Sequence, residues 1–118
     1  MNDNPVVIVG ASRTPMGGFG GEFADLSASE LGSAAISDAI SKAGIETGDV
    51  DDVIMGVVLA AGQGQAPARQ ASLGAGIPKA VGATTVNKMC GSGMKAAMIA
   101  HDNILAGTHD VMVAGGME

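Results

Sequence analysis

The stretch GATTVNKMCGSGMKAAMIAHDNIL, residues 82–105, joins a β-branched run to the one cysteine of the chain and then to a long apolar segment. Residues 82–87 are rich in Thr and Val, which predicts a short strand. From Cys90 to Leu105 the spacing of apolar residues predicts a helix, which Gly107 closes. Cys90 is therefore expected where a strand passes into a helix.

Three further strands are expected from short apolar runs. VVIVGA (6–11) is a continuous β-branched run of the kind that is buried on both faces of a sheet. Residues 53–60 and 110–116 have a similar character and complete the order β-α-β-α-β-α-β. That order predicts an α/β fold, a layer with a mostly parallel sheet and right-handed crossovers.

The first two helices have recognisable end signals. Ser27 followed by Glu30 has the spacing of a capping box, and Gly44 suits the position just past a helix end. The apolar residues between them fall on one half of the helix, which indicates a surface helix. A second, short helix is expected to begin near Pro67 and to end at one of the two glycines within residues 74–76.

The helix expected from Cys90 to Leu105 is apolar on most sides rather than on one. Such a helix is expected to be buried on most sides. A single sheet layer covers one side, so a second layer has to come from a missing part of the protein or from a partner. The large apolar residues concerned are Met94, Met98, Ile99, Ile104 and Leu105.

Composition and charge narrow the class of protein. The 118 residues are 47% apolar, but they include two Phe, no Trp and no Tyr, against 19 Gly. Such a chain packs through small side chains and close approach of backbones. The net charge of −6, with six scattered Lys and Arg, argues against nucleic acid or an anionic membrane as a partner.

The start of the chain and its cysteine count bear on the compartment. The first ten residues lack the basic and apolar regions of a signal peptide, and no apolar run approaches the ~20 residues that cross a bilayer. A single cysteine excludes an internal disulfide and suits a reducing compartment. We expect a soluble, cytoplasmic chain without a membrane partner.

Other binding chemistries find little support in the sequence. GASRTPMGG (10–18) has neither the dinucleotide pattern nor a P-loop ending, and GQGQAP (62–67) has proline where the third glycine would pack. His101 and His109 lack the spacing of metal ligands, so no metal site is expected. The acidic run GDVDD (48–52) is interpreted as a solvated turn.

Cys90 is the candidate for chemistry. The unpaired N–H groups of a helix N-terminus stabilise an anion such as a thiolate, and the thiolate is the reactive form of cysteine. Gly91 and Gly93 leave room around the sulfur, and the same N–H groups suit an oxyanion. Spacing alone leaves a second interpretation open, and favours it: an inert cysteine buried at a tight helix–sheet contact.

Four segments, in order and across essentially the whole chain, resemble the thiolase family of acetyl-CoA C-acyltransferases. VNKMCGSGMKA (86–96) resembles the family's segment around its acyl-accepting cysteine. SRTPMGGFGGEF (12–23) and GQGQAPARQA (62–71) resemble the loops after its first and second strands, and DVMVAGGME (110–118) the strand after the nucleophile helix.

The resemblance implies an acyltransferase that works through an acyl-cysteine. Cys90 would attack an acyl-CoA thioester, and a second acyl-CoA, deprotonated at its α-carbon, would take the acyl group to give a 3-ketoacyl-CoA. The reverse reaction is thiolysis by coenzyme A. Acyl-CoA and coenzyme A are then substrates, with no permanently bound cofactor. Gln65 is expected to line the pocket, because its loop follows a strand at the edge of the sheet where ligands gather.

The resemblance also implies that residues 1–118 are an incomplete N-terminal thiolase domain, inactive alone. The family's second cysteine, its Asn and its His lie in later segments, and the apolar helix is sandwiched between two similar halves. Residues 82–87 are expected to be an edge strand that pairs across a two-fold axis, in a homodimer or a dimer of dimers.

Two alternatives stay open. The first is a ketoacyl synthase acting on carrier-protein thioesters, although those relatives usually have a Ser-rich segment after the cysteine rather than CGSGMKA (90–96). The second is a non-catalytic binding or assembly module in which Cys90 is structural.

Overall fold

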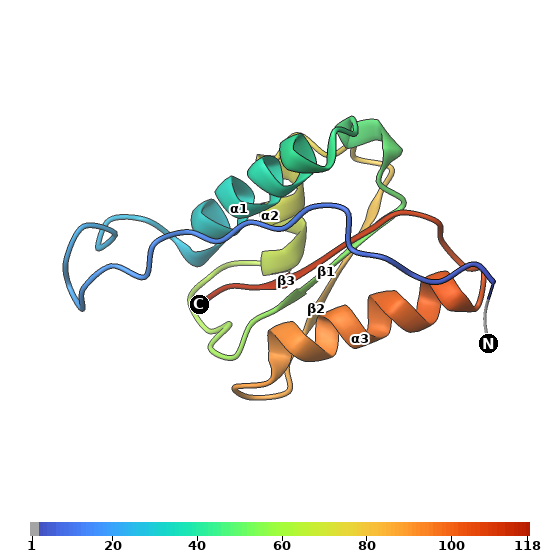
Figure 1. Cartoon of the computed structure of the whole chain (residues 1–118). Helices are drawn as coiled ribbons and strands as arrows, with labels where there is room; N and C mark the ends of the chain where they lie inside the picture. The colour runs from blue at the N-terminus through green and yellow to red at the C-terminus, as the bar shows by residue number, and fades with distance from the viewer. Residues whose placement is uncertain (1–2) are drawn as a thin grey trace.

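The computed structural model describes residues 3–118 and has three layers (Figure 1). The middle layer is a parallel sheet in which β1 (Asp52–Gly56) lies between β2 (Gly82–Val86) and β3 (Met112–Gly116). Helices α1 (Ala28–Ala43) and α2 (Pro67–Gly74) cover one face of the sheet, and α3 (Ser92–Leu105) covers the other. The α/β class, the parallel sheet and the edge position of β2 are confirmed.

The register of the sheet brings the carboxyl ends of all three strands to one edge. Asp52 at the start of β1 is level with Gly82 and Met112, and Gly56 at its end is level with Val86 and Gly116. Each strand is five residues long and is shorter than the run that predicted it at one end only. The edge where these strands end is where α3 begins.

The predicted signals at the ends of α1 and α2 are confirmed. The Glu30 N–H donates to Ser27 Oγ at 3.1 Å, and the Ser27 N–H donates to Glu30 Oε2 at 2.7 Å, which completes the capping box. Gly44 ends α1 with φ of 71°, in the left-handed region that favours glycine. Pro67 is the first helical residue of α2, where its missing N–H costs nothing.

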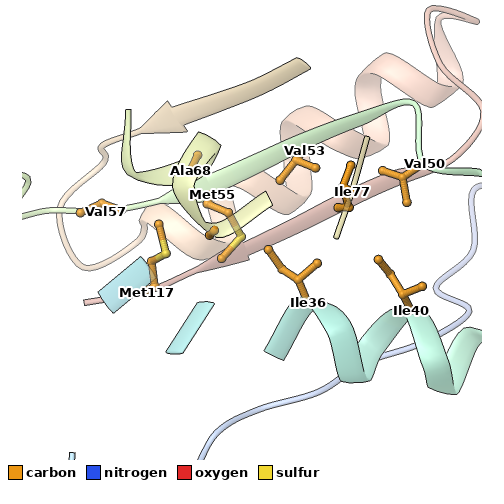
Figure 2. Packing of buried hydrophobic residues seen from close by; sticks show 10 residues of the cluster. Ile36, Ile40, Val50, Val53, Met55, Val57, Ala68, Ile77 and Met117 are labelled. Carbon is orange, nitrogen blue, oxygen red and sulfur yellow. The ribbon is translucent and has the colours of Figure 1, made fainter. Parts of the chain in front are cut away.

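The core lies between the sheet and the α1–α2 layer (Figure 2). Val53 and Met55 of β1 point toward Ile36 and Ile40 of α1, and all four are almost fully buried. Ile54, between them, is 2% exposed and, by strand alternation, points to the opposite face, toward α3. Burying each such side chain is worth about 1.5–3 kcal/mol, so β1 anchors both faces of the fold.

The prediction of a first strand at residues 6–11 is wrong. The segment belongs to no strand of the sheet; it lies beside the free edge of β3, and a cavity of about 520 Å³ is lined by both. Val7, Ile8 and Val9 are between 62% and 89% exposed. A β-branched run predicts extended backbone but not a partner, and no backbone hydrogen bond joins residues 6–11 to a strand of the described chain.

The acidic run before β1 is more than a solvated turn. Its first part belongs to a short 3₁₀ helix, Thr47–Asp49. The Asp51 carboxylate accepts from the N–H groups of Val111 and Asp110, at 3.0 and 2.9 Å. These backbone donors hold the pKa of Asp51 below its ordinary value of 3.8. Asp51 therefore ties the approach to β3 to the start of β1.

The outer side of α3 has no cover in the described part of the chain. Met94, Met98 and Leu105 are 74%, 53% and 53% exposed, whereas Ala96 and Ala100 are buried against the sheet. One side of the helix is thus covered by this layer and the other is not, as its apolar pattern predicted. Among residues 3–118, no helix combines the length and the apolar character needed to span a bilayer.

We therefore predict that residues 1–118, expressed alone, bind a hydrophobic dye and self-associate. Each large side chain left in water forgoes about 1.5–3 kcal/mol of burial. Replacing Met94 and Met98 with Gln should reduce dye fluorescence, whereas Leu73→Gln on α2 should change it little. A monodisperse monomer without dye binding would contradict this packing argument.

Candidate active site

A cavity of about 640 Å³ opens at the carboxyl edge of the sheet, around the N-terminus of α3. Its walls come from five segments that are distant in sequence: residues 12–16, 31–35, 56–58, 89–93 and 116–118. The volume is in the range of small-molecule sites in proteins. The sheet register brings three of these segments together, 56–58, 89–93 and 116–118, because the strand ends and the turn before α3 share this edge.

Cys90 lies in the turn between β2 and α3, and its side chain lines the cavity. The residue is exposed, and its thiol is free. This exposure removes the main support for the interpretation of Cys90 as a buried structural cysteine. An exposed thiol at the edge of a cavity is placed to meet a ligand.

The helix begins two residues later than expected. Cys90 and Gly91 precede α3, which starts at Ser92 with Gly91 as its N-cap. Met89 has φ of 49°, in the left-handed region, so the chain turns sharply before it enters the helix. The N–H groups of Gly91 and Ser92 donate to Lys88 and Met89 carbonyls within this turn, so neither is free for an oxyanion. The expectation of an oxyanion site therefore does not extend to these two N–H groups.

Glycines let the first turn of α3 press against the strand ends. A Cβ on Gly56 of β1 would lie 2.6 Å from both the Cβ and the carbonyl carbon of Ser92, closer than real Cβ atoms come. A Cβ on Gly116 of β3 would lie 3.2 Å from the Gly93 Cα. Side chains at these positions would push the helix away from the sheet, so the contact places Cys90 relative to β1 and β3.

Two polar side chains brace the turn that carries Cys90. Asn87 accepts from the Met89 N–H at 2.9 Å and donates to the Val58 carbonyl oxygen at 3.2 Å. Ser92 is 5% exposed, and its hydroxyl bonds to backbone groups of Lys88 and Met89. The sequence analysis missed both residues. An Asn in the turn before the expected helix was the available signal, since Asn side chains often bond the backbone two residues on.

The opposite wall of the cavity is anchored to α1. Ser12 donates its hydroxyl hydrogen to Asp38 Oδ2 at 2.7 Å, and Lys42 contacts the same carboxylate at 2.7 Å. The hydrogen bond from Lys42, followed by that from Ser12, lowers the pKa of Asp38 from its ordinary value. The segment 12–16 is therefore fixed to α1 at its first residue. The sequence did not indicate these residues as part of the site.

The end of the chain forms the third side of the cavity. Glu118 accepts from the N–H groups of Val58 and Leu59, at 3.0 and 2.8 Å. Met117 is buried against Gly32 of α1. These contacts fix the backbone that leaves β1 and β3, on either side of the α3 N-terminus.

The structure does not bring Gln65 to Cys90. Gln65 is exposed in the loop between β1 and α2 and is not among the residues that line the cavity. The loop is held by Gln70, whose amide donates to the Gln63 and Gln65 carbonyl oxygens at 2.8 Å each. A substrate-binding role for the Gln65 side chain stays a prediction.

The two histidines lie away from this cavity. His101 Nδ1 is 3.1 Å from Asp102 Oδ1, and His109 Nε2 is 3.7 Å from Asp52 Oδ2. Across residues 3–118, no group of three or more His, Cys, Asp or Glu side chains is arranged to hold a metal ion. Neither a histidine nor a metal cluster therefore accompanies the Cys90 thiol in the described cavity.

Comparisons with known proteins identify the family of this α/β domain. Residues 6–118 match the family model described as thiolase, N-terminal domain. The chain is 58% identical over 115 residues to the mitochondrial acetyl-CoA acetyltransferase of Danio rerio, covering 98% of this chain and 27% of that protein. It is 57% identical over 118 residues to acetyl-CoA acetyltransferase 2 of Arabidopsis thaliana, covering 100% of this chain and 29% of that protein.

A solved structure has the same fold. The crystal structure of Acat5 thiolase from Ascaris suum in complex with coenzyme A matches with a TM-score of 0.91 and 38% sequence identity, covering 92% of this chain and 28% of that chain. The chain belongs to the thiolase family, as its four motifs indicated. It spans 27% to 29% of the length of these relatives.

Proposed function

We propose that this domain supplies the nucleophile of an acyl-CoA C-acyltransferase and that Cys90 accepts the acyl group. The observation that carries the proposal is the exposed Cys90 thiol in a 640 Å³ cavity. Membership of the thiolase family favours acyl-CoA over the carrier-protein thioesters of a ketoacyl synthase. The two similar enzymes are named for acetyl-CoA, and the similar crystal structure contains coenzyme A.

The proposed reaction has two halves. In the first, the Cys90 sulfur attacks the carbonyl carbon of an acyl-CoA, a new thioester bond forms, and the bond to the coenzyme A sulfur breaks. In the second, a carbanion formed at the α-carbon of another acyl-CoA attacks the acyl-enzyme, and the Cys90 sulfur leaves. Thiolysis is the reverse. Covalent catalysis of this kind replaces one difficult step by two easier ones.

Of the groups that the proton transfers of this reaction need, residues 3–118 bring neither a histidine nor a second thiol to the cavity, and the one carboxylate there, Glu118, accepts from the N–H groups of Val58 and Leu59. A base must remove the α-proton, and donors must stabilise the oxyanion. The sequence has one cysteine, and neither histidine lines the cavity of Cys90. We therefore propose that these 118 residues are the N-terminal part of a longer thiolase, whose remainder supplies the base and covers the outer side of α3. A permanently bound cofactor is not part of the proposal.

The acyl-accepting role predicts that the complete protein, incubated with acetyl-CoA, gains one acetyl group at Cys90. Mass spectrometry of its peptides locates the group. Cys90→Ser should lower turnover by about a thousandfold or more, because serine is a poor nucleophile without a matched base, while the thermal midpoint stays nearly unchanged.

Two outcomes would contradict this assignment. One is an active enzyme in which the acetyl group is found on another residue while Cys90 remains unmodified. The other is measurable thiolysis by residues 1–118 alone, which would show that the described residues hold a sufficient base.

The same proposal includes a place for Gln65 at the substrate. Its side chain has no hydrogen bond within the described residues, so Gln65→Ala leaves the loop contacts intact. We predict that this variant raises KM for acyl-CoA by about three- to tenfold, the loss of one hydrogen bond. Gln70→Ala, which loosens the loop itself, is the control. Unchanged kinetics for Gln65→Ala, with altered kinetics for Gln70→Ala, would assign the loop a purely structural role.

A further part of the proposal is self-association through β2, in a homodimer or a dimer of dimers. This strand forms one edge of the sheet, and edge strands expose unpaired backbone groups. We predict that the complete protein sediments as a dimer or tetramer at micromolar concentration. Thr84→Lys on the exposed side of β2 should weaken the assembly, and Thr108→Lys after α3 should not. A wild-type monomer would count against this arrangement.

We also propose a cytoplasmic location for this protein. A single cysteine suits the reducing cytoplasm, and fatty acid metabolism is a setting that fits acyl-CoA chemistry. The Danio rerio relative carries the word mitochondrial in its name. Cell fractionation of the source organism decides between these compartments.

A further inference from the structure

The turn that presents Cys90 contains a residue in an unfavourable conformation. Met89 has φ of 49°, and residues with a Cβ enter this left-handed region only at a cost. The Met89 side chain is 66% exposed, so its own packing does not hold the backbone there. Other contacts must hold it, because a relaxed Met89 would redirect the next residue, Cys90.

The hydroxyl of Ser92 makes two hydrogen bonds that bracket Met89. The Lys88 N–H donates to Ser92 Oγ at 2.9 Å, and Ser92 Oγ donates to the Met89 carbonyl oxygen at 2.6 Å. One hydroxyl thus binds the N–H of the residue before Met89 and the carbonyl oxygen of Met89 itself. Since Ser92 is 5% exposed, water does not easily replace either bond.

Ser92 itself is fixed to the sheet. The space where Gly56 would carry a Cβ is occupied by the backbone and Cβ of Ser92. This contact fixes the Ser92 hydroxyl relative to the end of β1. The two hydrogen bonds of the hydroxyl in turn fix the Lys88 N–H and the Met89 carbonyl. Cys90 is the next residue in the chain, so the position of its thiol depends on the conformation of Met89.

We propose that Ser92 is a positioning residue for Cys90: its hydroxyl holds Met89 in the left-handed conformation that directs the thiol into the cavity. Ser92 lines the cavity, but both hydrogen bonds of its hydroxyl go to the backbone of the turn, and it is through this backbone that we infer it acts. The inference rests on the proposed function where it concerns acyl transfer, but the position of the thiol can be tested without a substrate.

The test compares Ser92→Ala with Ser29→Ala in the complete protein. Both serines are 5% exposed, and Ser29 donates to the Pro67 carbonyl oxygen at 3.4 Å, in the contact between α1 and α2. Two rates are measured by mass spectrometry: acetylation of Cys90 by acetyl-CoA and alkylation of Cys90 by iodoacetamide. Ser92→Ala should slow acetylation by about tenfold or more, because small misplacements of a reacting group are costly. It should change the alkylation rate as well, whereas Ser29→Ala should change neither.

A second variant separates positioning from loss of stability. Asparagine tolerates the left-handed region better than methionine does, so Met89→Asn should recover part of the acetylation rate in the Ser92→Ala background. A purely structural role for Ser92 predicts no such recovery. If Ser92→Ala alone does not fold, a folded double variant with near-normal acetylation supports the proposal, and a folded but slow one overturns it.

The remaining outcomes are distinct. Wild-type acetylation at Cys90, with Ser92→Ala equally fast, would overturn the role of Ser92 and leave the proposed function standing. A wild type that takes up no acetyl group would overturn the proposed function instead. The alkylation rates then decide the role of Ser92, because iodoacetamide needs no acyl-CoA site: a changed rate supports it, and an unchanged rate refutes it.

Discussion

The contact between the first turn of α3 and the ends of β1 and β3 is the constraint on which the site depends. Gly56, Gly93 and Gly116 meet with no side chains between the backbones, and Ser92 fills the space beside Gly56. A helix held this close to a sheet cannot shift along it without a clash, because protein interiors are close-packed. The turn that precedes the helix, with Cys90 in it, is placed by the same contact.

The low aromatic content of the chain follows from this construction. α3 rests on the sheet through Ala96 and Ala100, and α1 approaches α2 through small residues such as Ser29 and Gly32. The larger buried side chains gather mainly in the core between the sheet and the α1–α2 layer. Close backbone contacts give a rigid edge to the sheet. They also leave the outer side of α3, with Met94 and Met98, without cover in the described residues.

The sequence was most informative where a local rule decides the structure. The capping box of Ser27 and Glu30 and the left-handed Gly44 depend on neighbouring residues, and the structure has both, together with the predicted alternation of helices and strands from α1 onward. The prediction of a strand at residues 6–11 was wrong for a non-local reason, because a strand needs a partner that its own sequence does not specify. The one-sided cover of α3 was predictable from its apolar pattern.

For the candidate site, the sequence could single out Cys90 but not its surroundings. The cavity joins residues 12–16 to residues 116–118, two segments from opposite ends of the chain that no local rule brings together. The importance of Ser92 and Gly56 arises from a contact between segments 36 residues apart in the chain. No spacing rule within NKMCGSG (87–93) predicts the left-handed conformation of Met89. With the sharp turn at this residue, the helix starts two residues after Cys90.

A crystal structure of the complete protein with Gly56→Ala tests the central claim most directly, with Gly48→Ala as the reference. An added Cβ at Gly48 meets no atom within 4 Å, so that variant should superpose on the wild type. The added Cβ at Gly56 must displace the first turn of α3, and we predict that the Cys90 thiol moves with it out of its position in the cavity. A Gly56→Ala structure with the turn and Cys90 unmoved would contradict the view that this backbone contact places the nucleophile.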